Sequence, residues 1–336
     1  MIVGTAVPPF IDLISRNVGL LEARIAIVSN NADMIFDRRY FVDPVMESLV
    51  TDYRRVDELP PESDYDARIL VLDQPHLQPG IAADACGVTA VAPFSKWEAA
   101  SQDRRFTLFG NQGLLYRFAL RVLEERYQIS SFHANAVYSA ERNELVIAMG
   151  GGNSGKSPVL LAAVSNGYEV FATELVHVRV RKGNVEFFKG SVVDNIRVGN
   201  VLYDFPELRS TIRVPDEALD PWELKIPVDF TAWEAKPAVL SNARFRIIVP
   251  KVEAGRVPSI RMPIRGAGLA KVLFDNASEK IGTSFTMYER LASSGFDDAH
   301  LAAARYVRMQ ALAASDDLVN AESVIGTARA FLEIVA

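Results

Sequence analysis

The residues best suited to chemistry lie in one short stretch in the middle of the chain, Gly150-Gly-Gly-Asn-Ser-Gly-Lys-Ser157. A glycine, four intervening residues and then Gly-Lys-Ser make the spacing of a phosphate-binding loop, or P-loop. Glycines let backbone N–H groups turn towards a phosphate, Lys156 would lie along the β- and γ-phosphates of a nucleotide, and Ser157 would offer its hydroxyl to Mg²⁺. The pattern predicts a nucleoside-phosphate site rather than a glycine-rich turn with an incidental lysine. The residues expected to bind are Gly150, Gly151, Gly152, Asn153, Ser154, Gly155, Lys156 and Ser157.

The segments on either side of this loop are expected to position it. Residues 145–149 form an apolar run that is typical of a buried strand. Residues 158–166 predict a short helix, which Gly167 would end in a left-handed conformation. Residues 168–173 then predict a strand next to the P-loop strand, and Glu174 follows it. A carboxylate therefore follows the loop lysine after only one short helix and one strand.

Other charged residues are candidates for the same site. Arg197 is a candidate contact for a phosphate or an anionic substrate, and Asp194 is a candidate for a second metal-linked acid. Arg256, Arg261 and Arg265 are spaced for anion contacts too, although a solvated basic strand face is the commoner meaning of such a pattern. No His/Cys cluster suits zinc, and no Gly-x-Ser-x-Gly nucleophile turn is present in the sequence.

Composition bounds the class of protein. The 336 residues are enough for two domains or for one elaborated domain. A net charge of −6 argues against nucleic acid as the main partner, because phosphate backbones attract basic surfaces. The single cysteine, Cys86, excludes a disulfide framework and fits a cytoplasmic location. We see neither an apolar stretch of membrane-spanning length nor a signal-peptide pattern, so no membrane association is expected.

The pattern of apolar segments predicts an α/β protein in three parts. A small α+β domain at 1–110 would precede a P-loop nucleotide-binding domain with a mixed sheet at 111–265, and a mainly helical region at 266–336 would follow. Within the first part we expect strands at 23–28, 67–72 and 106–109 and short helices at 11–16 and 44–53, and after it a longer helix capped by Asn111.

Four features around the loop resemble a known family. They are His133 on the strand before the loop, the loop itself, Gly167 closing a short helix, and Thr173-Glu174 after the next strand. The arrangement resembles the HPr kinase/phosphorylase superfamily, which is related in fold to phosphoenolpyruvate carboxykinase, over roughly residues 112–200. It is most similar to divergent HPr-kinase-like proteins with a different N-terminal half, which include small-molecule and peptide-tailoring kinases. The resemblance implies ATP, Mg²⁺ and a homo-oligomer.

The resemblance also implies roles for individual residues. His133 is expected to contact a phosphate or the acceptor, whereas by itself a lone histidine on such a strand is more often a core residue. Glu174 falls on the second position of the family's usual Asp-Asp pair, which implies a base on the acceptor hydroxyl, linked to the metal with Ser157; the alternative is a surface acid at a strand end. Thr173 replaces the first acid of the pair. The family's usual Ser/Thr-Gly-x-Gly-Lys spacing is changed here to Gly-Asn-Ser-Gly-Lys.

The leading hypothesis is an ATP- and Mg²⁺-dependent kinase that phosphorylates a hydroxyl group on a small molecule, with Lys156, Glu174 and His133 as catalytic residues. A second hypothesis is a protein-serine kinase/phosphorylase of the HPr kinase type. A third is a nucleotide-binding regulator without activity, which the replacement at Thr173 and the altered loop spacing permit. Neither the acceptor nor the choice between ATP, GTP and ADP/pyrophosphate follows from the sequence.

Overall fold

The fold was analysed in a computed structural model, which separates into two compact units. Unit 1 comprises Met1–Leu123 and Thr283–Asp297, and unit 2 comprises Glu124–Gly282 and Asp298–Ala336. Each unit is described by itself. The structure describes residues 12–36, 53–55, 64–84, 87–96, 114–181, 184–215, 219–241, 243–281, 299–315 and 319–336.

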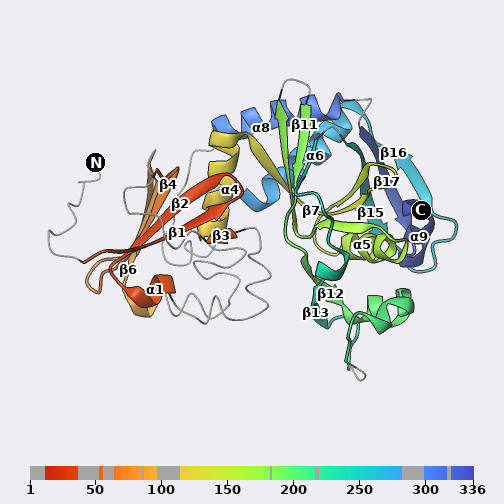
Figure 1. The fold of residues 1–336 in the computed structure, drawn as a ribbon, viewed down its shortest axis with the longest axis horizontal. Coiled ribbons are helices and arrows are strands. Elements are labelled where there is room, and N and C mark those ends of the chain that lie inside the picture. The colour runs from red at the N-terminus through yellow and green to blue at the C-terminus, as the bar shows by residue number, and fades with distance from the viewer. Residues whose placement is uncertain are drawn as a thin grey trace. The chain divides into compact units, whose positions relative to one another are not determined.

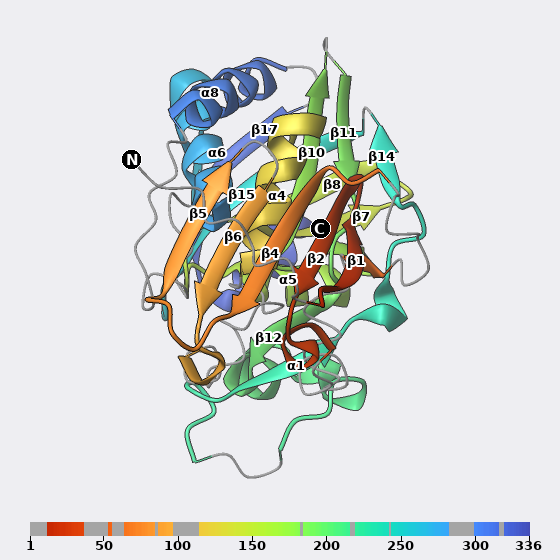
Figure 2. The ribbon, with the colours of Figure 1, turned by 90° about the vertical axis from the view of Figure 1, so that its left-hand side faces the viewer.

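Unit 1 contains a six-stranded mixed sheet, which Figure 2 shows with its strands side by side. The predicted strands at 23–28 and 67–72 are confirmed as β2 and β4, which pair in parallel. The predicted short helix at 11–16 is wrong, because residues 14–16 begin a strand that pairs antiparallel with β2 through a tight turn at Leu21, where φ is 50°. In spatial order the strands are β3 (Tyr53–Arg55), β1 (Ile14–Leu20), β2 (Ala23–Ser29), β4 (Ala67–Asp73), β6 (Gly87–Ala92) and β5 (Gly80–Asp84).

Three expectations for the first part of the chain concern residues that are not described. The predicted strand at 106–109 and the capping residue Asn111 lie outside the described residues, as does all but the last residue of the predicted helix at 44–53. The described helices here include α1 (Ala32–Phe36) and α4 (Leu114–Tyr127), and the boundary between the units falls within α4.

Unit 2 is built on a nine-stranded mixed sheet (Figure 1). Antiparallel pairs make up one side, and at the centre β8, β15 and β17 run parallel to one another. The strand predicted at 145–149 is confirmed as β8, which pairs antiparallel with β7, the strand that carries His133. In spatial order the strands are β14 (Val239–Ser241), β11 (Asn184–Phe188), β10 (Leu175–Arg181), β7 (Ile129–Ser139), β8 (Glu144–Met149), β15 (Arg244–Val252), β17 (Val319–Gly326) and β16 (Ile260–Pro263), while β9 (Glu169–Ala172) also pairs with β7.

Helices cover both faces of this sheet, as Figure 1 shows. The alternation of side chains along each strand sends successive residues to opposite faces, so both faces must be buried. On β8, Leu145, Ile147 and Met149 pack towards α6 (Gly266–Ile281) and α8 (Ala299–Ala313). Val146 and Ala148 pack towards α5 (Lys156–Ser165) and α9 (Phe331–Val335). The P-loop strand is therefore held rigidly in the middle of a three-layered core.

In the described residues of the C-terminal region, helices α6, α8 and α9 account for most of the chain, as the sequence predicts, but the region also contains a strand that the sequence does not predict. After α6 and α8 the chain returns to the sheet as β17, which pairs in parallel with β15 along its length. Its pattern is obscured by polar residues: Glu322 is only 7% exposed and receives two hydrogen bonds from Arg261 on β16. A paired charge of this kind replaces the apolar residue that a buried strand normally shows.

A buried ion cluster fixes α8 to the rest of unit 2. The Glu124 carboxylate is 1% exposed and accepts hydrogen bonds from the guanidinium groups of Arg305 and Arg308 and from the Ser130 hydroxyl. Arg305 also donates to the Ser278 hydroxyl on α6 at 3.0 Å. Because all the partners are in place, the desolvation cost of the buried charges is offset.

A small hairpin stands beside the main sheet, formed by β12 (Val193–Arg197) and β13 (Lys225–Asp229). It packs on the α5 side of the core, together with the short π-helix η3 (Asn200–Asp204) and the 3₁₀ helix η4 (Pro206–Ser210). No helix in the described ranges combines the length and apolar character needed to cross a bilayer.

Candidate functional site

The P-loop connects β8 to α5 in a conformation that demands glycine at two positions. Gly150 has φ of 148°, and a Cβ there would lie 2.7 Å from the Ser154 hydroxyl oxygen. Gly155 has φ of 112°, and a Cβ there would lie 2.8 Å from a methyl carbon of Val252 on β15. Side chains are excluded by both backbone conformation and space, so the loop backbone can curl tightly around a ligand.

The positively charged side chain of Lys156 folds back onto the P-loop. The Lys156 ammonium donates hydrogen bonds to the carbonyls of Gly150 at 2.6 Å and Gly151 at 3.1 Å. Gly155 stands at the N-cap of α5, where no side chain caps the first turn of the helix. Loop N–H groups, the helix terminus and Lys156 together suit an anion with several negative oxygens.

Asp194 on β12 lies against the loop. Its Oδ2 accepts hydrogen bonds from the Ser157 hydroxyl at 3.3 Å and from the Asn135 amide at 3.1 Å, and its Oδ1 accepts from the Asn195 N–H at 2.7 Å. The side chain is buried. Burial, with the negative charge of Glu174 as a second cause, raises the pKa of Asp194 to about 7, although its three donors act to lower it. A cation beside Ser157 would favour the ionised form.

Glu174 occupies a kink in the sheet. Strands β9 and β10 both pair with β7 but at different residues, and the chain changes direction between them at Thr173 and Glu174. Glu174 has φ of 57°, which is uncommon for a residue with a side chain, and its carboxylate lies 3.6 Å from the His133 Nε2. Kinks of this sort re-aim side chains next to functional sites.

The sequence predicts that the strand before Glu174 lies next to the P-loop strand. This is wrong, because β7 lies between β9 and β8. The side chain of Asn135 on β7 connects the two. Its amide N–H donates to Asp194, and its side-chain oxygen accepts from the Glu174 N–H at 3.3 Å. A continuous series of hydrogen bonds therefore joins Ser157 of the P-loop, through Asp194 and Asn135, to the backbone of Glu174.

Thr173 does not face this polar site. Its side chain is fully buried, with its hydroxyl 2.9 Å from the Ser191 carbonyl and 2.6 Å from the Val193 carbonyl. Thr173 therefore fastens the kink to the start of β12, the strand that supplies Asp194. A carboxylate at this position would meet two carbonyl oxygens instead of donors.

Arg197 contacts the tip of the P-loop from the far end of β12. Its Nη2 donates to the Asn153 side-chain oxygen at 2.9 Å, and its Nη1 donates to the Trp222 carbonyl and lies 3.5 Å from the Glu223 carboxylate. Of the four arginines that the sequence offers as anion contacts, Arg197 is the one that contacts the P-loop.

The other arginines are placed differently. Arg261 pairs with Glu322 and Arg256 pairs with Glu253, so both serve ion pairs of the β15–β16 region. Arg265 is exposed. No group of three or more His, Cys, Asp or Glu side chains converges within the part of the chain that the structure describes. A site of one hydroxyl and one carboxylate suits Mg²⁺, which usually keeps waters and takes further oxygens from substrate phosphates.

Two residues matter more than the sequence indicates. The sequence presents Asp194 only as a candidate for a second acid, and in the structure it is the direct hydrogen-bond partner of Ser157. The sequence does not single out Asn135, because its contacts depend on β7 lying between the two acidic segments. An amide on an apolar strand, two residues after His133, is the only signal that could have pointed to it.

Comparison with known proteins adds little to this geometry. No protein-family model and no curated protein matches the chain. Among solved structures, the HPr(Ser) kinase/phosphatase from Coxiella burnetii is similar at 14% sequence identity, over 40% of this chain and 75% of that chain, with a TM-score of 0.23. A likeness this remote carries no functional argument, so the function must be inferred from the residues themselves.

Proposed function

We propose that the chain is a P-loop kinase that transfers a phosphoryl group from ATP to a hydroxyl group, with a small molecule as the acceptor. The observation that carries the proposal is the hydrogen-bonded series from Ser157 through Asp194 and Asn135 to Glu174. It links a phosphate-binding loop to the backbone N–H of Glu174, the residue at the kink whose side chain is the proposed base. Phosphate binding needs only the loop, whereas transfer to a hydroxyl is accelerated by a carboxylate placed to accept the hydroxyl proton.

The P-loop is the proposed site for the nucleotide phosphates. The loop N–H groups and the N-terminus of α5 would receive the phosphate oxygens, and Lys156 would exchange its loop carbonyls for the β- and γ-phosphates. Ser157 and Asp194 would hold Mg²⁺, which neutralises charge that develops on the phosphates. Asp194 then serves as a metal ligand in its ionised form.

Glu174 is the proposed base. Its carboxylate would accept the proton of the acceptor hydroxyl as the oxygen attacks the γ-phosphate, and its charge keeps the metal side of the site negative. His133, 3.6 Å from that carboxylate, would orient it or contact the transferred phosphate. Because Asp194 supplies a second carboxylate from another strand, Thr173 need not be acidic for the chemistry.

The proposal is tested by incubating the protein with γ-labelled ATP, Mg²⁺ and pooled hydroxyl metabolites, and separately with a carrier protein. We expect label on a metabolite. Glu174→Gln should lower transfer at least about a hundredfold, within the range typical of general bases, while nucleotide affinity changes little. Glu169→Gln, at the other end of β9, is the matched control and should transfer normally. Full transfer by Glu174→Gln would remove the base assignment.

A protein serine is the second candidate acceptor, and label on the carrier protein alone would favour it. Nucleotide binding without transfer to either class of acceptor would favour a regulatory protein.

A further inference from the structure

Two exposed aromatic rings lie together beside the P-loop. Tyr203 on η3 and Trp222 before β13 are 59% and 44% exposed, and their ring centroids are 5.8 Å apart with an interplanar angle of 32°. We call this pair the aromatic ledge. Two exposed aromatic rings in contact present apolar π-surface to solvent, on which a planar ligand group can stack.

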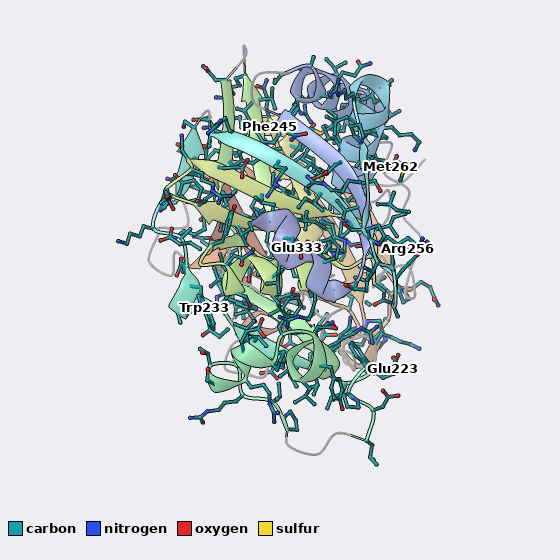
Figure 3. All side chains as sticks on the ribbon, turned by 90° about the vertical axis from the view of Figure 1, so that its right-hand side faces the viewer. Glu223, Trp233, Phe245, Arg256, Met262 and Glu333 are labelled. Atoms are coloured by element: carbon teal, nitrogen blue, oxygen red, sulfur yellow. The ribbon has the colours of Figure 1, made fainter. Side chains whose placement is uncertain are left out.

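The ledge is held in place by the backbone around it. A Cβ on Gly199 would lie 2.6 Å from the Trp222 indole, so the ring packs directly on the Gly199 backbone. The Gly199 N–H donates to the Pro221 carbonyl at 2.6 Å, and the Trp222 N–H donates to the Asp220 carboxylate at 3.1 Å. Figure 3 labels Glu223, the residue after Trp222, at the outside of the fold. The indole is therefore fixed in position while its outer surface stays open.

The same guanidinium group joins the ledge to the phosphate loop. Arg197 donates from Nη2 to Asn153 in the loop and from Nη1 to the Trp222 carbonyl. The ledge thus begins one side chain away from the loop that is proposed to hold the phosphates.

The contact between Trp222 and Arg197, at the far end of β12, indicates which part of the ligand the ledge would receive. Asp194, near the start of β12, faces Ser157 and the proposed transfer end of the site, where the acceptor must enter. Arg197 lies three residues further along the strand, about 10 Å away at the usual rise of about 3.3 Å per residue. The ledge therefore lies at the Arg197 end of β12, away from the end where Asp194 contacts Ser157 and where the acceptor is proposed to enter.

We propose that the aromatic ledge of Tyr203 and Trp222 is the nucleobase subsite, on which the base of the nucleotide stacks. This inference rests on the proposed nucleotide site and extends it to the part of the ligand that the P-loop does not contact. Stacking on aromatic side chains tolerates any base, because every base has a π-face. The ledge would then add affinity for a nucleoside over bare phosphates without selecting strongly between purines.

The experiment compares Mg²⁺-ATP with Mg²⁺-tripolyphosphate, which has the phosphates but no base, by calorimetric titration. Trp222→Ala and Tyr203→Ser are the test variants. Trp233→Phe is the matched control, because this ring packs against Phe230 instead. Each test variant should weaken ATP binding about tenfold or more, and Trp222→Phe should restore most of it. Tripolyphosphate affinity should stay within about twofold of wild type, which also shows that the variants are folded.

Three results would overturn the inference. If ATP affinity is unchanged in both test variants, the base does not stack there. If ATP and tripolyphosphate weaken equally, the ledge supports the loop rather than the base. If wild type binds neither ligand, the proposed nucleotide site itself fails, and the subsite fails with it. Loss of ATP affinity alone supports the subsite and leaves the choice of acceptor untouched.

Discussion

Replacing Asp194 with asparagine should change how the stability of the metal-free protein depends on pH. Burial and the charge of Glu174 raise the pKa of Asp194 from 3.8 to about 7. The folded state therefore holds a proton that the unfolded chain releases between about pH 4 and pH 7. In that window the native state binds more protons than the unfolded state, so the free energy of unfolding falls as pH rises.

The magnitude follows from the difference between the two pKa values. The values differ by roughly 3, and one pKa unit corresponds to about 1.4 kcal/mol. Wild type should lose up to about 4 kcal/mol between pH 4 and pH 8 from this carboxyl. Below pH 4 the penalty is absent, and above pH 7 it no longer grows. Asp194→Asn cannot ionise and should lack this loss.

The assay is urea unfolding at pH 5 and pH 8 with EDTA, followed by tryptophan fluorescence. Both proteins should carry Trp97→Phe, so that the signal comes from Trp222 and Trp233 in unit 2. The difference between wild type and Asp194→Asn cancels the other titrating groups. We expect the variant to gain stability relative to wild type as pH rises. Parallel pH curves for the two proteins would refute the reasoning.

Two further substitutions test the packing around the site. Thr173→Asp should lower the free energy of unfolding by at least about 2 kcal/mol, because it buries a carboxylate against two carbonyl oxygens. The control, Thr173→Ser, keeps the hydroxyl and should cost less than about 1.5 kcal/mol. A Thr173→Asp variant that is stable and more active would contradict the geometry. Arg305→Met should lower the free energy of unfolding by roughly 3 kcal/mol in urea, because the buried Glu124 charge would lose one of its two arginine partners. Arg209→Met, at an exposed arginine, is the control and should be neutral. Equal effects of the two substitutions would argue against the buried cluster.

The parts of the fold that the sequence predicts well are those with strong local signals. The apolar run of β8, the short helix α5 and the left-handed Gly167, with φ of 82°, follow from local pattern alone. The strand β17 could not be recognised, because Glu322 interrupts its pattern and its burial depends on Arg261 from another strand. Pairing partners remote in the chain are not visible in a local window.

The candidate site divides in the same way. The P-loop and Glu174 could be located from spacing, since motif and strand end lie within one segment of the chain. The partnership of Ser157 with Asp194, and its extension through Asn135, depends on the β12 hairpin and on β7 lying between β8 and β9. Only the folded arrangement shows that Asp194 places a second carboxylate near Glu174, while the Thr173 hydroxyl bonds to backbone carbonyls.

The most direct test of the central claim is calorimetric titration of Mg²⁺-ATP into wild type and Lys156→Ala, with exposed Lys251→Ala as the control. The account predicts binding to wild type and to Lys251→Ala, and at least a tenfold loss, about 1.4 kcal/mol, in Lys156→Ala. Equal binding by Lys156→Ala, or no binding by wild type, would contradict a nucleotide site at Gly150–Ser157.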